Sequence, residues 1–359
     1  MTQREEEILR LIQSDPMIQQ QDIANRLGIA RSSVAVHISN LIRKGYIAGK
    51  GYVLRSGSYT VVVGGVNMDI GGRSFAPLIR ADSNPGAVTV NLGGVGRNIA
   101  HNLSLMDVDV RLMAAYGDDA HGAQVAASCA ALNIDLSHGL RVSGGTTSTY
   151  LYLMDHRGEM VLAVSDMSIC EKVSPTYLAE KLPVLQSARV VVADANIPGE
   201  SLEFLANNCD SPLFVDPVST TKAEKLRPIL GKIHTLKPNK LEAELLSGVP
   251  IRSPADVETA ARKLLSLGVR RVFISLGADG VCAAEGDRVL WLKNLPGRMV
   301  NTTGCGDAFM AALVWAYQEG LDLEHSALAG LAAGSIAMES LETINPNMSA
   351  EALRARMEG

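Results

Sequence analysis

Apolar residues near the start of the chain recur at the three- and four-residue spacing of amphipathic helices. A first helix is expected around residues 8–12, ending at Asp15-Pro16, because proline lacks a backbone donor and disfavours helix before it. Helices at residues 20–27 and 31–44 follow, separated by Gly28-Ile29-Ala30. The third should turn Val34, Ile38, Leu41 and Ile42 inward. Residues 46–54 alternate around a Gly-Lys-Gly centre, which predicts a short hairpin.

Beyond residue 59 the pattern changes to short, buried-type apolar runs that alternate with amphipathic stretches. Strands are expected at residues 59–65, 189–193, 213–215, 234–236 and 271–276, and helices at 99–106, 124–132, 202–207 and 255–267. This alternation predicts an α/β domain whose mostly parallel sheet is covered by helices on both faces.

The charge is uneven between these two parts. Residues 1–55 contain eight Lys and Arg against five Asp and Glu, whereas the whole chain of 359 residues has a net charge of −5. Five scattered cysteines without a Cys-x-x-Cys pair argue against a disulfide framework and a zinc ribbon. The start lacks the apolar core of a signal peptide, and no apolar run reaches the length of a membrane span. We therefore expect a cytoplasmic protein without a membrane partner, divided into residues 1–55 and 56–359.

The order of elements in residues 1–55 resembles a winged helix-turn-helix. That resemblance implies a DNA partner, with the third helix in the major groove. The residues that would meet base edges and phosphates are Arg31, Ser32, Ser33 and His37, and Lys44 would meet backbone phosphates near the wing. The alternative is a three-helix packing or dimerisation module with a solvated polar face.

In the second part, Asn301-Thr-Thr-Gly-Cys-Gly-Asp307 runs directly into an apolar helix at residues 308–317. Glycines at a helix start leave the N–H groups of Gly304, Cys305 and Gly306 open to an anion at the positive end of the helix dipole. Asp307 is then placed to take a proton from an attacking hydroxyl, unless it only stabilises the helix start. The motifs of phosphate-loop NTPases, dinucleotide enzymes, zinc proteases and α/β-hydrolases are absent from the sequence.

Four further polar elements accompany it. Asn67-Met-Asp69 follows the first strand, where an amide and a carboxylate can grip vicinal hydroxyls. The glycines of residues 93–100 precede a predicted helix with Asn98 in its first turn. The alternative is that these glycines only allow a tight connection between strand and helix. Residues 237–242 end in Glu242, which could hold magnesium through water. Residues 275–280 form a glycine turn where a nucleotide could rest.

In this order, the five elements resemble the PfkB family of ribokinase-like carbohydrate kinases, over about residues 59–345. The resemblance implies a ribokinase-like three-layer fold, ATP and Mg²⁺ as cofactors, and a sugar or nucleoside substrate. It makes Asp307 the general base and Gly304, Cys305 and Gly306 the anion hole. It assigns the sugar to Asn67, Asp69, Gly93, Gly94, Asn98 and Asn196, and Mg-ATP to Asn239, Glu242, Ser275, Gly277 and Gly280. Transfer of a γ-phosphoryl group depends on positioning and electrostatics, so no covalent step is needed.

Two positions depart from the family pattern. Cys305 stands where alanine is usual; its N–H still serves the anion hole, although a thiol there is open to oxidation. Asn301 stands where an aspartate often helps to bind a potassium-like cation, which leaves activation by K⁺ open.

Residues 70–91 and 147–165 alternate apolar and polar positions and interrupt the α/β pattern. They are similar to the family's β lid, which covers the sugar and often pairs with another subunit's lid. A homodimer through the lid is therefore expected.

Within the family, the sequence is most similar to that of pseudouridine kinases in five segments, residues 81–86, 93–100, 192–197, 215–219 and 234–239. Asp82, Ser83 and Asn84 offer donors and acceptors suited to a uracil edge; the alternative is a turn selected for its shape. The hypothesis is ATP-dependent phosphorylation of the 5′-hydroxyl of pseudouridine. The alternatives are a kinase for ribose, inosine or cytidine, and a sugar-sensing transcription regulator.

Overall fold

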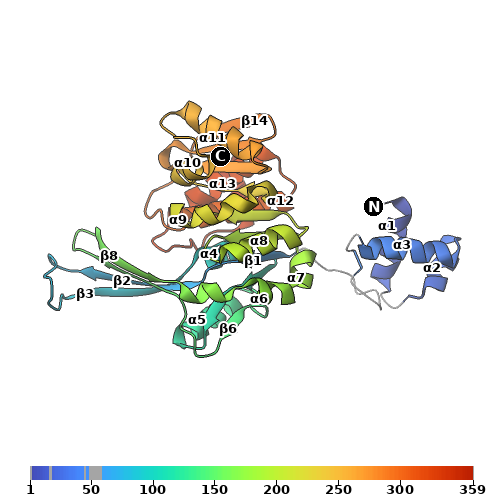
Figure 1. The fold of residues 1–359 in the computed structure, drawn as a ribbon, viewed down its shortest axis with the longest axis horizontal. Helices are drawn as coiled ribbons and strands as arrows, with labels where there is room; N and C mark the ends of the chain where they lie inside the picture. Colours follow the sequence, from blue (N-terminus) through green and yellow to red (C-terminus); the bar gives the residue numbers. More distant parts are fainter. Residues whose placement is uncertain (1, 16–17, 44–45, 48–58, 359) are drawn as a thin grey trace. The chain divides into compact units, whose positions relative to one another are not determined.

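The computed structural model describes residues 2–15, 18–43, 46–47 and 59–358, which fall into two compact units, Met1–Ser58 and Tyr59–Gly359. The first unit contains α1 (Gln3–Ser14), α2 (Gln20–Leu27) and α3 (Arg31–Arg43) (Figure 1). Val34, Ile38 and Leu41 of α3 are buried, whereas Ile42, expected inward, is 47% exposed. One residue after Leu41 the helix has turned by about 100°, away from the core. Lys44 and most of the expected hairpin lie outside the described residues.

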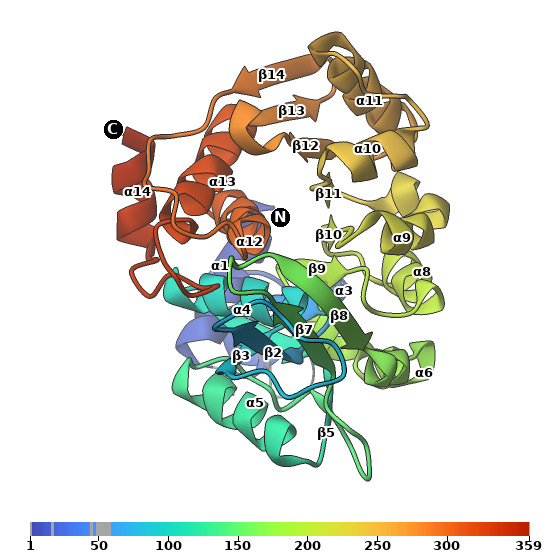
Figure 2. The same ribbon diagram turned by 90° about the vertical axis from the view of Figure 1, so that its left-hand side faces the viewer.

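The second unit is built on an eight-stranded sheet in the order β14-β13-β12-β11-β10-β9-β1-β4 (Figure 2). The strands from β4 to β12 are parallel, and β13 and β14 are antiparallel to their neighbours. Their bounds are β1 (Thr60–Val63), β4 (Val110–Met113), β9 (Val190–Asp194), β10 (Leu213–Asp216), β11 (Thr235–Leu236), β12 (Arg271–Ser275), β13 (Val281–Glu285) and β14 (Arg288–Leu292). The expected mostly parallel α/β fold is therefore confirmed.

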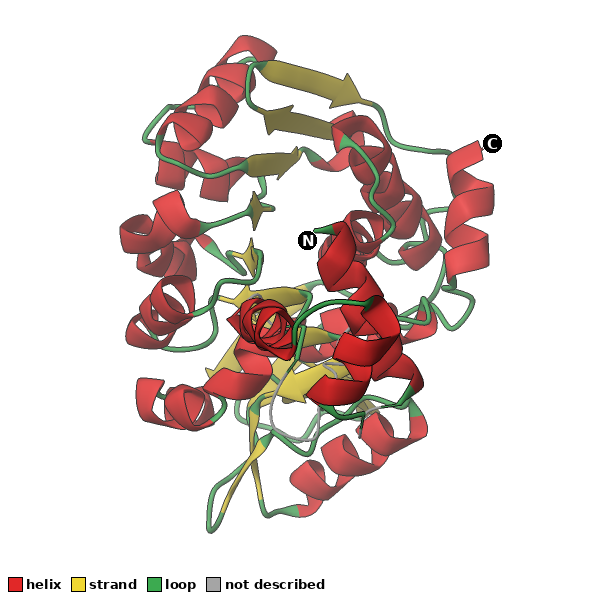
Figure 3. Cartoon of the chain, turned by 90° about the vertical axis from the view of Figure 1, so that its right-hand side faces the viewer, coloured by secondary structure: helices red, strands yellow, loops and turns green. Residues whose placement is uncertain are grey.

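Helices cover both faces of this sheet (Figure 3). One face carries α4 (Val95–Leu105), α5 (Ala120–Ala131), α12 (Cys305–Gln318), α13 (Leu323–Ala337) and α14 (Ala350–Glu358). The other face carries α6 (Pro175–Glu180), α7 (Leu182–Ser187), α8 (Gly199–Asn208), α9 (Thr220–Ala223), α10 (Lys240–Ser247) and α11 (Pro254–Ser266). The 3-10 helices η1 (Ser168–Lys172) and η2 (Glu224–Lys232) lie on this face as well. A third 3-10 helix, η3 (Gly277–Asp279), follows β12. Because side chains alternate along β1, Val61 and Val63 pack into one core and Val62 into the other.

The two interrupting segments form a separate sheet in the order β3-β2-β7-β8, which extends away from the central sheet (Figure 1). Its strands are β2 (Asn67–Ser74), β3 (Gly86–Gly93), β7 (Thr149–Met154) and β8 (Met160–Asp166). We call it the lid sheet. Asn67 and Asp69, expected in a loop after the first strand, instead begin the lid strand β2. Between β3 and β7 in the sequence, β5 (Ala115–Gly117) and β6 (Leu140–Val142) form a separate parallel pair.

None of the described helices combines the length and the apolar run that a bilayer span requires.

Candidate active site

The helix α12 begins at the glycine-rich segment, with Gly304 as its N-cap at φ +83. A Cβ at Gly304 would lie 2.2 Å from the carbonyl oxygen of Thr343, so only glycine fits both the conformation and the space. Gly306 is exposed, and Gly304 and Cys305 are half-buried. The N–H of Cys305 makes a long 3.4 Å contact with the Thr302 carbonyl, which an anion could replace. The geometry suits an anion site at this helix start.

Asp307, in the first turn of α12, faces the same region. Its Oδ2 accepts a hydrogen bond of 2.9 Å from Nδ2 of Asn98, which belongs to α4. Burial, with a contribution from the charge of Asp216, raises the pKa of Asp307 to about 8, against the opposing effects of Asn98 and Lys237. A carboxylate with a raised pKa is a competent proton acceptor near neutral pH. Asn98, expected on the sugar, thus also orients the candidate base.

A cavity of about 1230 Å³ brings most of the predicted sugar-contacting residues together with the candidate base. It is lined by Asn67, Asp69, Gly94, Asn98, Asn196 and Asp307 among others. Asn67 donates to Asp69 Oδ1 at 2.6 Å, and burial of Asp69 raises the pKa of its carboxyl. Gly93 lies under this carboxylate, since a Cβ there would be 2.2 Å from Asp69 Oδ2. A Cβ at Gly94 would lie 2.5 Å from the carbonyl oxygen of Gly65, so both positions allow a close approach that a side chain would block.

Three lid residues expected at a uracil edge are not brought to this cavity. Asp82, Ser83 and Asn84 are exposed or half-buried in the turn between β2 and β3 and do not line it. The Asn84 side chain is used by the turn itself: Oδ1 accepts from Ile79 N, and Nδ2 donates to the carbonyls of Ile79 and Asp82. The geometry therefore favours the alternative stated above, a turn selected for its shape.

Other cavity residues were not singled out from the sequence. Two aromatic side chains, Tyr150 and Tyr152, come from β7, and Lys222 comes from α9. Lys222 Nζ donates to Asn196 Oδ1 at 2.5 Å, and the Asn196 side chain also hydrogen-bonds to the Asp194 carboxylate, so the donors left for a ligand are those of the ammonium. The cavity also receives Arg97, His101 and Gln124 from α4 and α5. Their positions depend on tertiary packing, so no local motif announced them.

A buried charge cluster lies at the carboxyl ends of neighbouring strands. Asp194 ends β9, Asp216 ends β10, and Lys237 follows β11. Lys237 Nζ lies 3.1 Å from Asp216 Oδ2. Asp194 accepts from the backbone N–H of Gly65 and of Asn196, and its burial raises the pKa of its carboxyl. Two aspartates that end adjacent parallel strands are a signal of a ligand site that can be read from the sequence, because ligands of such sheets bind at the carboxyl ends of the strands.

Only some of the residues predicted to contact the nucleotide lie together in one cavity. Asn239, Ser275 and Gly277 line a second cavity of about 590 Å³ beside Trp291. Gly280 lies outside both cavities; at φ +91, a Cβ would be 2.1 Å from the carbonyl oxygen of Leu292, so this glycine allows the chain to enter β13. Asn239 and Glu242 cap α10 reciprocally, with Glu242 Oε2 accepting from Asn239 N.

Neither predicted metal site forms a closed cage. Among the described residues, no group of three or more His, Cys, Asp or Glu could hold an ion. Glu242 retains an oxygen beyond its cap, which suits Mg²⁺ held mainly by phosphates and water. At Asn301, Nδ2 donates to the Leu341 carbonyl at 3.2 Å and Oδ1 accepts from Thr303 N. Both ends of the Asn301 amide are thus used within the protein, and these contacts give no support to a K⁺ site at this position.

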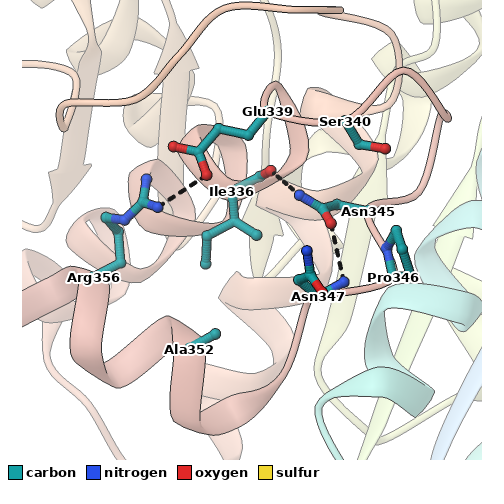
Figure 4. A pocket seen from close by; sticks show the side chains of 8 residues that line it. All are labelled: Ile336, Glu339, Ser340, Asn345, Pro346, Asn347, Ala352 and Arg356. Atoms are coloured by element: carbon teal, nitrogen blue, oxygen red, sulfur yellow. Dashed lines mark hydrogen bonds and ion pairs between the residues drawn. The ribbon is translucent and has the colours of Figure 1, made fainter.

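The segment 343–347 is shared between two cavities. Thr343 and Ile344 line the cavity of Asp307. Asn345, Pro346 and Asn347 line a third one, of about 350 Å³, between α13 and α14 (Figure 4). There Asn345 Nδ2 donates to the Ile336 carbonyl, and Arg356 pairs with Glu339 at 3.1 Å. These contacts fasten the C-terminal helix.

In the first unit, the predicted DNA-contacting residues lie at the start of α3. Arg31, Ser32 and Ser33 are exposed, and His37 is half-buried. The structure therefore leaves the side chains of the first turn of α3 accessible.

A carboxylate with raised basicity, a helix start suited to an anion and a polar cavity beside them are the features expected of a phosphotransferase acting on an alcohol. The chain belongs to the PfkB family of carbohydrate kinases: residues 58–350 match the model described as pfkB family carbohydrate kinase. Residues 1–48 match a winged helix-turn-helix DNA-binding model.

Named relatives agree with this placement. The chain is 40% identical over 353 residues to YeiI, an uncharacterized sugar kinase of Escherichia coli (strain K12), covering 98% of both chains. It is 38% identical to the pseudouridine kinase of the same organism, covering 82% of this chain and 95% of that one. A carbohydrate kinase from Agrobacterium tumefaciens has a similar structure, with a TM-score of 0.74, 26% identity, and coverage of 84% and 97%.

Proposed function

We propose that the protein transfers the γ-phosphoryl group of ATP to the 5′-hydroxyl of pseudouridine. The observation that carries the kinase chemistry is that Asp307 shares one cavity with the Asn67–Asp69 pair, beside the glycine-rich start of α12. The choice of pseudouridine rests on the similarity to the Escherichia coli pseudouridine kinase across nearly its whole length.

The side chains divide the work as follows. Asn67 and Asp69 hold the ribose hydroxyls, and Asn98 keeps the Asp307 carboxylate turned toward the 5′-hydroxyl. Asp307 accepts the hydroxyl proton as the oxygen attacks the phosphorus. The N–H groups of Gly304, Cys305 and Gly306 then stabilise the charge on the transferring group. The hydroxyl is thereby activated without a covalent enzyme intermediate.

The base would lie at the end of the cavity formed by Lys222, Asn196 and the β7 tyrosines. The Lys222 ammonium is a donor, which suits a carbonyl oxygen of uracil and not the amino group of cytosine. Tyr150 and Tyr152, whose ring centroids are 5.7 Å apart, provide aromatic surface for a planar base.

ATP would place its phosphates before α12 and use the residues of the second cavity, Asn239, Ser275 and Gly277. Glu242 would hold a water of Mg²⁺, and the ion, when bound, neutralises charge on the β- and γ-phosphates. The contacts of Asn301 give no support to K⁺ activation at that position.

A steady-state panel of pseudouridine, uridine, cytidine, inosine, ribose and fructose tests the substrate. We expect the highest kcat/KM for pseudouridine. A much higher value for another member would replace pseudouridine as the substrate while leaving the kinase assignment in place.

We further propose a homodimer through the outer face of the lid sheet. Strand register puts Asp69, Tyr150 and Ser165 on the cavity face, and an apolar set on the opposite face. That set is Ile70, Val88, Val90, Leu151, Leu153, Leu162 and Val164, of which Val88 is 72% and Leu162 63% exposed. A contiguous apolar sheet face in water favours burial, and a second lid offers a matching surface.

The first unit is proposed to bind DNA through α3, so that the protein joins a kinase to a DNA-binding module. The alternative of a sugar sensor without catalysis is less well supported, because a sensor needs neither a base nor an anion hole, and the chain carries the residues proposed for both.

A further inference from the structure

A buried lysine lies beside the first turn of α12. Lys237 directly follows β11, and its side chain is buried. A Cβ built on Gly306 would lie 3.4 Å from Lys237 Nζ, so the ammonium lies against the turn that carries the candidate anion hole. Because Gly306 has no side chain, nothing from that residue separates the ammonium from the space before the helix.

The ammonium has a single acidic partner at hydrogen-bond distance. Lys237 Nζ is 3.1 Å from Asp216 Oδ2, and Asp216 is the sole hydrogen-bond partner of this ammonium within the described part of the chain. An ammonium has three N–H donors. Burial of a charged group is costly unless its donors are satisfied, which favours a second anion at this position.

The surrounding charges make this lysine distinctive. Asp194, Asp216, Glu242 and Asp307 all act electrostatically within the cluster, and Lys237 is the cation that interacts with three of them. A γ-phosphate entering this region meets a predominance of carboxyl groups. A fixed positive charge beside the helix start would offset that repulsion where charge develops during transfer.

Asp216 has a second contact, on the substrate side. Its Oδ1 accepts from the backbone N–H of Val218 at 2.8 Å. Val218 has φ +66, a strained conformation for a β-branched residue, and lines the cavity of Asp307. Ser219 N donates to the Pro217 carbonyl at 2.7 Å, which closes a tight three-residue turn. One carboxylate thus fixes both a wall of the substrate cavity and the lysine beside the helix.

We propose that Lys237 is a catalytic residue whose ammonium donates hydrogen bonds to the transferring γ-phosphoryl group, and that Asp216 is the residue that positions it. In this step the substrate oxygen forms a bond to the γ-phosphorus, and the bond from that phosphorus to the bridging oxygen of ADP breaks. The hydroxyl proton goes to Asp307, and Lys237 keeps its own proton. This role rests on the phosphotransferase chemistry of the family and not on the identity of the alcohol.

The test compares nucleotide binding with turnover in K237M, with K263M as the control, since Lys263 is an exposed lysine on α11. Calorimetry without any sugar measures the affinity for Mg-ADP and for the Mg²⁺ complex of adenylyl imidodiphosphate, which keeps a γ-phosphate. We expect K237M to bind the imido analogue at least about tenfold more weakly and ADP within about twofold of the wild type. Turnover should fall by about 10²–10³-fold. K263M should change none of these values.

The pH profile gives a second readout, which reports the effect of the Lys237 charge on the Asp307 carboxyl, while the difference between the two nucleotides reports the contact with the γ-phosphate. The groups facing Asp307 are Asn98 from α4, Asp194 from β9, Asp216 from β10 and Lys237 after β11, with Glu242 of α10 next to Lys237. Removing the positive charge in K237M should move the acid limb of kcat/KM to higher pH. Removing the negative charge in D216N should move it to lower pH.

If K237M does not fold, because Asp216 is left buried and unpaired, the double variant D216N/K237M replaces it. That variant removes both charges and keeps an amide oxygen for the Val218 N–H. The proposal is overturned if either folded variant binds ADP and the imido analogue with equal loss, or turns over within about threefold of the wild type.

Discussion

Asp307 derives its chemical character from the residues around it. Asn98 donates to it at 2.9 Å, while burial and the nearby charge of Asp216 raise the pKa of its carboxyl to about 8. An aspartate with an ordinary pKa near 4 would be ionised at neutral pH but would be a weak base. The environment therefore supplies basicity that the residue type alone does not have.

This environment predicts the pH dependence of the reaction. Only the ionised carboxylate accepts a proton, so kcat/KM should fall about tenfold per pH unit below about pH 8. Initial rates at subsaturating substrate between pH 5.5 and 9.5 measure this limb. A limb near the ordinary aspartate pKa, or a flat profile in this range, would contradict the assignment.

Local sequence predicted the residues of α12 well and the tertiary contacts poorly. Gly304 and Asp307 were predictable because a helix start and its glycines are adjacent in the chain. The Lys237–Asp216 and Lys222–Asn196 contacts join residues that follow different strands, so only the assembled sheet reveals them. Asn84 was assigned to a uracil edge because its amide has free donors in the sequence, but the turn consumes them.

At the scale of elements, strands with consecutive β-branched residues could be predicted from the sequence. Strands that contain a charged residue or several small residues could not. Thr60–Val63 and Val190–Asp194 are buried along their whole length and read as continuous apolar runs. The edge strand β4 was missed because Arg111 interrupts its short run. The hairpin of β13 and β14 was missed because small residues such as Ala283 and Ala284 give little strand signal.

The lid sheet carries a prediction at this scale. Placing two glutamates on its outer face, in L162E/V164E, should convert a dimer into a monomer, because two buried carboxylates per lid would lack partners. Light scattering coupled to gel filtration measures the mass. The control M299E alters an apolar residue that is 74% exposed and lies outside the lid sheet. A wild-type monomer, or an unchanged dimer mass in L162E/V164E, would contradict the lid interface.

At the scale of the whole molecule, the pattern and charge of the sequence change near residue 55, and the structure divides between residues 58 and 59. The two compact units, Met1–Ser58 and Tyr59–Gly359, do not share a buried core. The family of each unit could also be predicted from the sequence, because the motifs at α3 and α12 consist of residues that are adjacent in the chain. The identity of the sugar or base depends on the distant residues that converge on one cavity, and motifs do not encode that convergence.

The first unit carries a prediction about DNA. Fluorescence anisotropy with labelled DNA from upstream of the protein's own gene should detect binding that weakens as salt rises, because phosphate contacts release counterions. R31A should bind at least about fivefold more weakly. R10A, an exposed arginine on α1, is the matched control. Binding that is absent, or independent of salt, would argue against docking of α3 in a groove.

The proposed kinase activity depends on one chemical act, removal of a hydroxyl proton by Asp307. The variant D307N keeps the size and an acceptor oxygen but lacks the basic carboxylate. Between about pH 4 and about pH 8 the native carboxyl holds a proton that the unfolded chain has lost, so its contribution to stability falls as the pH rises. D307N should therefore melt no lower than the wild type at pH 8, and a loss of activity cannot be assigned to unfolding.

The most direct measurement is the turnover of D307N at pH 8 with saturating Mg-ATP and pseudouridine, or with whichever alcohol the panel identifies. The predicted result is a kcat reduced at least about a hundredfold, with the melting temperature preserved. A folded D307N whose turnover is close to that of the wild type would contradict the role of this carboxylate.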